Sequence, residues 1–142
     1  MTKRLPASTV APELAAKYYA KAVRFRRDAE AMLALGTEFS GNGVAVLCVH
    51  AAIAYADAVT IRAAGQKSKS GEHRDAATFL ASVVAIRTPD DKAALKALQA
   101  VLNRKDEVSY ADDLVGEFDA REMMARLDTF AAWADRRYAA MA

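Results

Sequence analysis

The segment from Val44 to Val59 is almost entirely apolar and is interrupted by His50 and Asp57. A helix that is apolar on all sides must be covered on all sides, so the chain has to supply other helices to cover it. The run is rich in alanine and falls short of the roughly 20 residues that a membrane span needs. We therefore expect a helix over about 43–64 at the centre of a bundle, and no membrane as a partner.

Helical spacing of apolar residues continues through most of the remaining chain. It predicts four more helices, over about 12–36, 72–86, 89–110 and 119–140. Only 6 Gly and 3 Pro are present, too few for the turns of an all-β fold. The prediction is an all-α fold, an antiparallel bundle of about five helices, in a single domain over 1–142 whose first residues, 1–11, are a flexible segment.

Cap residues mark several of these helix ends. Thr88 can cap the helix that begins with Pro89, and the two aspartates that follow suit the positive end of the helix dipole. Asp119 with Glu122 has the pattern of a capping box, which predicts the start of the last helix. Gly65 is expected to end the second helix.

Three segments carry a resemblance to a known family: VHAAIAYADAVTIRAAG, GEHRDAATFL and LNRKDEVSY. Together with the order of helices over about 12–140, they resemble the HEPN superfamily, small helical proteins of bacterial and archaeal defence and toxin–antitoxin systems. The resemblance implies a homodimer whose partner is RNA, a nucleotide or an antitoxin-like protein. In the catalytic branch it implies metal-independent RNA cleavage, by an arginine at the end of the fourth helix and a histidine that follows after four to six intervening residues.

This chain has the arginine but not the histidine. Arg104 falls at the expected place, and Tyr110 stands where the histidine is expected. Tyrosine titrates near 10 and is a poor base at neutral pH, whereas an arginine, here with Lys105 beside it, binds phosphate readily. Arg104, Tyr110 and Asp57 are thus the catalytic candidates of a ribonuclease, but the substitution favours a binding site over a cutting site.

Charge points to a second phosphate-binding candidate. From Arg104 to Glu122, three basic and seven acidic residues leave a balance of −4, which repels a polyanion. Around the segment GQKSKSG the balance is +3, and Lys67, Lys69 and Arg74 are the candidate ligands, with a solvated loop as the alternative. A solvated face is also expected for the basic residues of the first helix, namely Lys17, Lys21, Arg24 and Arg27.

His50 and Asp57 are seven residues apart, which places both on one side of their helix. A buried, unpaired carboxylate is costly, so two hypotheses compete. The pair anchors neighbouring helices, or Asp57 is the inward polar group that, as the resemblance implies, positions Arg104. A contact between Asp57 and Arg104 would serve both. His73 is expected to pack or cap the third helix, with a catalytic role as the alternative.

Metal and cofactor chemistry find no support in the sequence. The two histidines and the single cysteine, Cys48, do not have metal-ligand spacing, and no phosphate-cradling or dinucleotide motif is present. With one cysteine the chain has no internal disulfide, so a reducing cytoplasm is the expected compartment.

Three functions remain open. The first is a HEPN-like module, non-catalytic or weakly catalytic, that binds RNA, a nucleotide or a protein partner as a homodimer. The second is an RNA-cleaving toxin that uses Arg104 and Tyr110. The third is a helical adaptor without a ligand, which an exposed apolar patch would favour.

Overall fold

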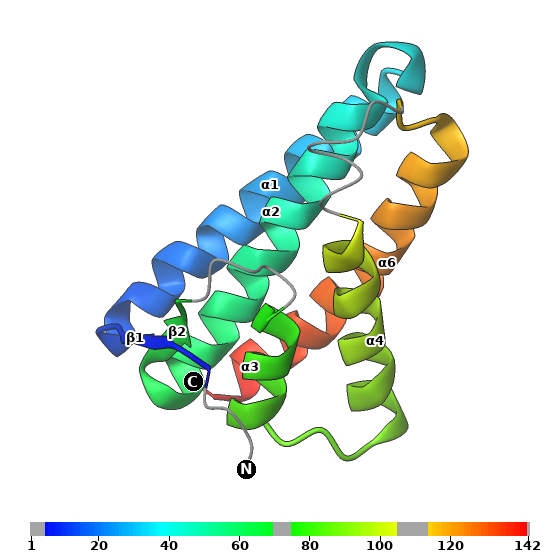
Figure 1. Cartoon of the computed structure of the whole chain (residues 1–142). Helices are drawn as coiled ribbons and strands as arrows, with labels where there is room; N and C mark the ends of the chain where they lie inside the picture. Colours follow the sequence, from blue (N-terminus) through cyan, green and yellow to red (C-terminus); the bar gives the residue numbers. More distant parts are fainter. Residues whose placement is uncertain (1–4, 70–74, 105–113, 142) are drawn as a thin grey trace.

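The computed structural model describes residues 5–69, 75–104 and 114–141. Within them lie five α-helices: α1 (Ala15–Ala34), α2 (Thr37–Ala64), α3 (Asp75–Val83), α4 (Pro89–Asn103) and α6 (Glu117–Ala140). A 3-10 turn, η1 (Pro12–Leu14), precedes α1, and two short strands, β1 (Ala7–Thr9) and β2 (Gln66–Ser68), lie beside the α1–α2 pair (Figure 1). The predicted all-α helical bundle is confirmed.

α1 and α2 form a long antiparallel hairpin (Figure 1). The chain turns at Gly36, whose φ of +98° is a conformation that glycine adopts at little cost. α6 runs antiparallel to α1, since Tyr19 reaches Asp135 and Arg26 reaches Asp128. α4 is antiparallel to α6. Because α2 and α6 are both antiparallel to α1, they run in the same direction.

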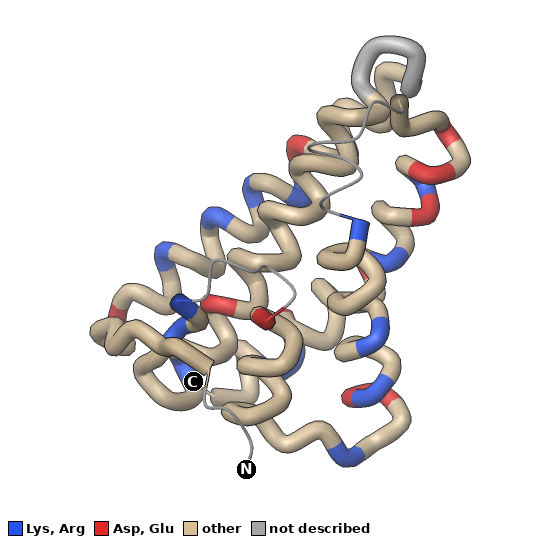
Figure 2. Tube along the Cα trace, in the orientation of Figure 1, with Lys and Arg blue, Asp and Glu red and all other residues tan. Residues whose placement is uncertain are grey.

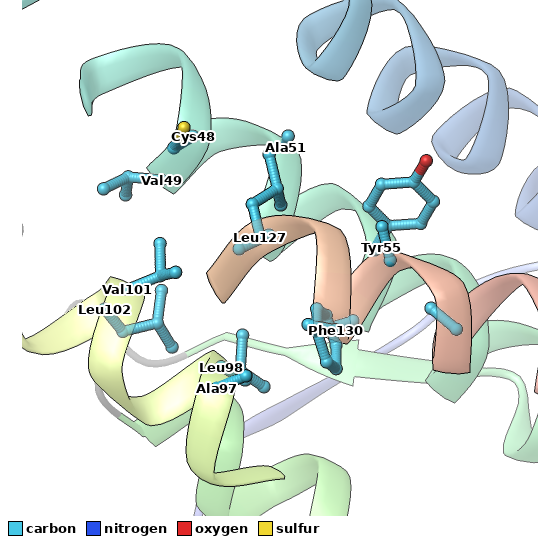
Figure 3. Close-up of a cluster of buried hydrophobic side chains, with 14 of the residues drawn as sticks. Cys48, Val49, Ala51, Tyr55, Ala97, Leu98, Val101, Leu102, Leu127 and Phe130 are labelled. Carbon is cyan, nitrogen blue, oxygen red and sulfur yellow. The ribbon is translucent and has the colours of Figure 1, made fainter. Parts of the chain in front are cut away.

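α2 is the central helix, as predicted. It contacts α1, α3, α4 and α6, and Figure 3 shows Val49 facing Val101 of α4. By length and composition its stretch Gly41–Ala64 could cross a membrane, but 78% of the apolar window is buried within the bundle. Cys48 is fully buried, and this burial raises the pKa of its thiol to about 12, so it is a core residue and not a reactive thiol.

The contact between α1 and α2 repeats every seven residues. A Cβ added to Gly43 would lie 2.6 Å from the Met32 Cε, so these residues touch. One repeat further along, the rings of Phe25 and His50 have centroids 5.5 Å apart. Seven residues are close to two turns, so the same step continues down the hairpin. Two facing pairs are thus observed, Met32 with Gly43 and Phe25 with His50. The same step places Tyr18 level with Asp57 as the next pair.

β1 and β2 pair antiparallel, with Ser8 opposite Lys67. A flexible segment had been expected over 1–11 and a loop at GQKSKSG, and the strands correct both expectations for residues 7–9 and 66–68. Gly65 ends α2 in the left-handed conformation, as predicted, at φ +65°. Its carbonyl then accepts from the Val10 N–H at 2.8 Å, so the turn after α2 holds the incoming chain in place.

The structure confirms one predicted helix start, that of α4, and corrects two others, those of α2 and α6. At α4, Thr88 and Asp91 form a reciprocal capping box, which confirms the predicted start. α2 begins at Thr37, earlier than expected, because the turn at Gly36 leads directly into helix. The predicted capping box of Asp119 is wrong, because α6 already begins at Glu117 and the Asp119 carboxylate faces α4 instead.

Candidate nucleic-acid interface

Arg104 is the C-cap of α4, and an acid lies beside it. Its NH1 atom is 3.5 Å from Oδ1 of Asp119 on α6, and the arginine side chain is 28% exposed. A carboxylate at this distance neutralises the guanidinium and opposes an approaching phosphate. Within the described structure Arg104 therefore links α4 to α6.

The described structure does not bring Asp57 and Arg104 together, so the contact that would have served both hypotheses is not made. The end of α4 packs against Val49 of α2 (Figure 3). Asp57 lies eight residues further along α2, which is about 12 Å at the helical rise. The charges that act on its carboxyl come from Lys67 and Lys21 instead.

Several predicted site residues lie outside the described residues, namely Lys105, Tyr110, His73 and Arg74. Their proposed roles stay predictions. Among the described His, Cys, Asp and Glu side chains, no group of three or more could hold a metal ion.

A different set of side chains comes together along the α1–α2 hairpin. We call it the cation–aromatic seam: Tyr18, Lys21 and Phe25 of α1, His50 of α2 and Lys67 of β2. The Lys67 Nζ lies 5.4 Å from the centroid of the Tyr18 ring, and the Lys21 Nζ lies 5.6 Å from that of Phe25. The His50 ring, which is exposed, also packs against the Phe25 ring. Two half-buried rings, each with a lysine over it, are thus aligned two helical turns apart.

Further cations extend the seam along α1. Figure 2 shows basic positions following one another along this helix. Lys17, Lys21 and Arg24 are spaced i, i+4, i+7 and are exposed, as is Lys69 just after β2. No residue of this group forms a salt bridge to a described acid, although Asp28 follows next in the row. The α1–β2 face therefore carries more cations than acids, although the buried Asp57 lies near Lys21 and Lys67.

Asp57 of α2 lies close enough to two lysines of the seam, Lys67 and Lys21, for their charges to act on its carboxyl. The seven-residue step of the hairpin places it level with Tyr18. It is only 8% exposed, and its carboxylate accepts no hydrogen bond from a described residue. Apart from the helix backbone bonds, its carbonyl accepts a hydrogen bond from the Thr60 hydroxyl at 3.2 Å. Burial raises the pKa of the Asp57 carboxyl to about 6, while the charges of Lys67 and Lys21 act in the opposite direction.

The sequence analysis did not identify the seam, since it assigned Lys21 to a solvated face and singled out neither Tyr18 nor Phe25. The innermost positions of α1 are small, which turns the two rings toward the edge of the hairpin. The signal that could have revealed this is the shared repeat of seven at 18, 25, 32 and at 43, 50, 57. The buried core positions of α1 are Ala15, Ala22 and Ala29.

A second surface feature lies where α1 ends and α6 begins. Leu35, Leu114 and Phe118 are 76%, 87% and 79% exposed. Leu35 lines an open groove of about 500 Å³ together with Glu117 and Arg121, so both helix ends border it. Exposed large apolar side chains around a groove are typical of protein-binding surfaces.

Comparison with known proteins adds no assignment to this geometry. No protein-family model, no curated protein and no solved structure matches this chain.

Proposed function

We propose that this protein is a HEPN-like module that binds single-stranded RNA through the cation–aromatic seam. The observation that carries the proposal is the pairing of two half-buried rings, Tyr18 and Phe25, each with a lysine over its face. Proteins that bind single strands use this combination, because bases stack on the rings while cations follow the phosphates.

The seam suits a single strand better than a duplex. In a duplex the base faces are stacked on one another and cannot reach a protein ring, whereas an unpaired strand can turn its bases outward. On binding, a base would take the place of the Lys21 ammonium on the Phe25 ring, and the ammonium would move to a neighbouring phosphate. The same exchange is available to Lys67 on Tyr18. RNA, as opposed to DNA, is favoured by the family resemblance alone.

Binding is favoured over cleavage at Arg104. Cleavage there needs a guanidinium that is available to the phosphate and a group that carries a proton at neutral pH. Arg104 has Asp119 beside it, and Asp57 belongs to the other end of α2. An RNA-cleaving toxin that uses Arg104 and Tyr110 remains the alternative. Incubation of RNA with the pure protein tests it, and we expect the RNA to stay at full length.

Binding can be measured as the fluorescence anisotropy of a labelled uridine-rich RNA of about ten nucleotides. Phe25→Ala should weaken binding about ten-fold, because stacking on one ring contributes on the order of 1–3 kcal/mol. Lys21→Gln should weaken it by a smaller factor. The matched controls are Phe118→Ala and Lys96→Gln, which remove an exposed ring and an exposed lysine far from the seam.

Circular dichroism would establish that each variant keeps its helices. Equal losses in the seam variants and in their controls would contradict the proposed site. So would a strong loss in Arg104→Ala with none in Lys21→Gln.

The exposed apolar side chains near the groove favour a second candidate, a protein-binding role for the end of the bundle where α1 meets α6. A homodimer or an antitoxin-like partner would cover Leu35 and Phe118 there. Light scattering across a range of concentrations tests the homodimer: Phe118→Ser should shift a dimer to monomer, whereas Phe25→Ser should not. If the wild type is a monomer at all concentrations, self-association is contradicted. A different protein would then be the partner for the surface around Leu35 and Phe118.

A further inference from the structure

We propose that RNA binding at the cation–aromatic seam is coupled to the uptake of one proton by Asp57. The inference rests on the proposed function, because it concerns the regulation of that same site. It assigns a role to a buried carboxylate that accepts no hydrogen bond from any described residue.

The position of Asp57 is fixed by the register of the α1–α2 hairpin. Contacts at two levels, Met32 with Gly43 and Phe25 with His50, set the register. The next step of seven residues puts Asp57 level with Tyr18, the ring over which Lys67 lies. The carboxyl group is therefore under one end of the seam and not at a distant point of the core.

Hydrogen bonds do not explain why the carboxylate is there. Buried carboxylates are normally satisfied by several donors, and Asp91 in this protein accepts four. Asp57 accepts none from a described residue and is more than nine-tenths buried. Its ionised form depends on the nearby ammonium groups of Lys67 and Lys21 for stabilisation.

The same two lysines are needed by the ligand. When they turn toward phosphates, Asp57 loses its countercharges and gains negative neighbours, and both changes favour the protonated carboxyl. On the described parts of the surrounding elements, the other charged or titratable groups include Lys17 and Arg24 of α1, His50 and Arg62 of α2, and Asp75 of α3. None of these is among the charges that act on the Asp57 carboxyl. Bound phosphate and ionised Asp57 thus compete for the same cations.

The direction of the pH effect follows from this competition. The pKa of Asp57 is about 6 in the free protein, because burial outweighs the effect of the lysines. Binding raises it further, so the complex holds more protons than the free protein at neutral pH. Affinity should therefore increase as the pH falls, by about ten-fold for each unit by which binding raises the pKa.

Two measurements test the coupling with the full chain and the same uridine-rich RNA. Calorimetry in phosphate and in Tris buffer at equal pH should give binding enthalpies whose difference reports proton uptake in the wild type and almost none in Asp57→Asn. Anisotropy from about pH 8 to about pH 5 should give tighter binding at low pH in the wild type and a much flatter profile in Asp57→Asn. Because the variant mimics the protonated acid, its affinity at about pH 8 should exceed that of the wild type.

His50→Gln is the control, because it removes the histidine of the seam and leaves Asp57 in place. Proton uptake that survives in Asp57→Asn and disappears in His50→Gln would overturn the proposal. Binding with no proton uptake in the wild type would overturn it as well, while leaving RNA binding intact. If wild type and Asp57→Asn both fail to bind RNA at every pH, the proposed function itself fails.

Discussion

At the scale of single residues, two aspartates in the described parts of the chain are buried, and their environments are opposite. Asp91 accepts from the Trp133 and Arg137 side chains, both at 2.9 Å, and from the Arg87 and Thr88 N–H groups at 3.0 Å. These donors hold the pKa of its carboxyl far below the usual range. Asp57 has no such donors among the described residues, and burial raises its pKa. The first carboxylate stabilises the fold, while the second destabilises it when ionised.

Asp57→Asn should therefore stabilise the protein at neutral pH. A folded-state pKa of about 6, against an ordinary value near 4, means that the folded protein binds more protons in this window than the unfolded chain. Stability is then lost as the pH rises from about 4 to about 6, by at most about 3 kcal/mol. Urea unfolding at several pH values checks this: the variant should exceed the wild type above pH 6, and the gap should narrow toward pH 4. A variant less stable than the wild type at neutral pH would contradict the account of Asp57.

At the scale of elements, the cap of α4 is a testable contribution to stability. Thr88→Ala removes the side-chain acceptor of the Asp91 N–H, which should lower the free energy of unfolding by about 1 kcal/mol. The control is Thr129→Ala on the exposed face of α6, where the hydroxyl donates to the Ala125 carbonyl within a continuous helix. That change should be close to neutral. Equal losses in the two variants would show that the cap contributes nothing specific.

The elements themselves could largely be predicted from the sequence, because their signals are local. The capping box of Thr88, the left-handed Gly65 and the all-round apolar character of α2 each act within a few residues. The strand pair β1–β2 could not be predicted, since its partners are almost 60 residues apart and each is only 3 residues long. Pairing of that kind depends on where α2 ends in space.

The candidate site was less predictable than the fold for the same reason. Arg104 and Asp57 were joined by the family resemblance, but the antiparallel packing of α4 on α2 separates them and gives Arg104 a different partner, Asp119. The seam combines residues of α1, α2 and β2, and its charges on α1 look like an ordinary solvated face when that helix is considered alone. Only the register of the hairpin brings Phe25 to His50.

At the scale of the whole molecule, charge is separated although the net charge is only +2. Basic residues follow α1 and β2, while the first turns of α6 carry Glu117, Asp119 and Glu122 around a single Arg121 (Figure 2). Such a dipolar arrangement would direct a polyanion to one face and away from the other.

This separation predicts the salt dependence of RNA binding. If Lys21, Lys67 and one further cation of α1 contact phosphates, three counterions per site are released, and affinity should fall about 20-fold between 50 and 200 mM salt. Lys21→Gln should reduce the slope by about a third. Arg121→Gln, which removes a cation near the acidic end of α6, should leave the slope unchanged. Binding that is insensitive to salt would contradict phosphate contacts in the seam.

The most direct test of the central claim is an NMR titration of isotope-labelled protein with a uridine-rich RNA. The account predicts that the amide and side-chain signals that shift belong to Tyr18, Lys21, Phe25, His50 and Lys67. Shifts that centre on Arg104 and Asp119 instead, or an absence of shifts at saturating RNA, would contradict it.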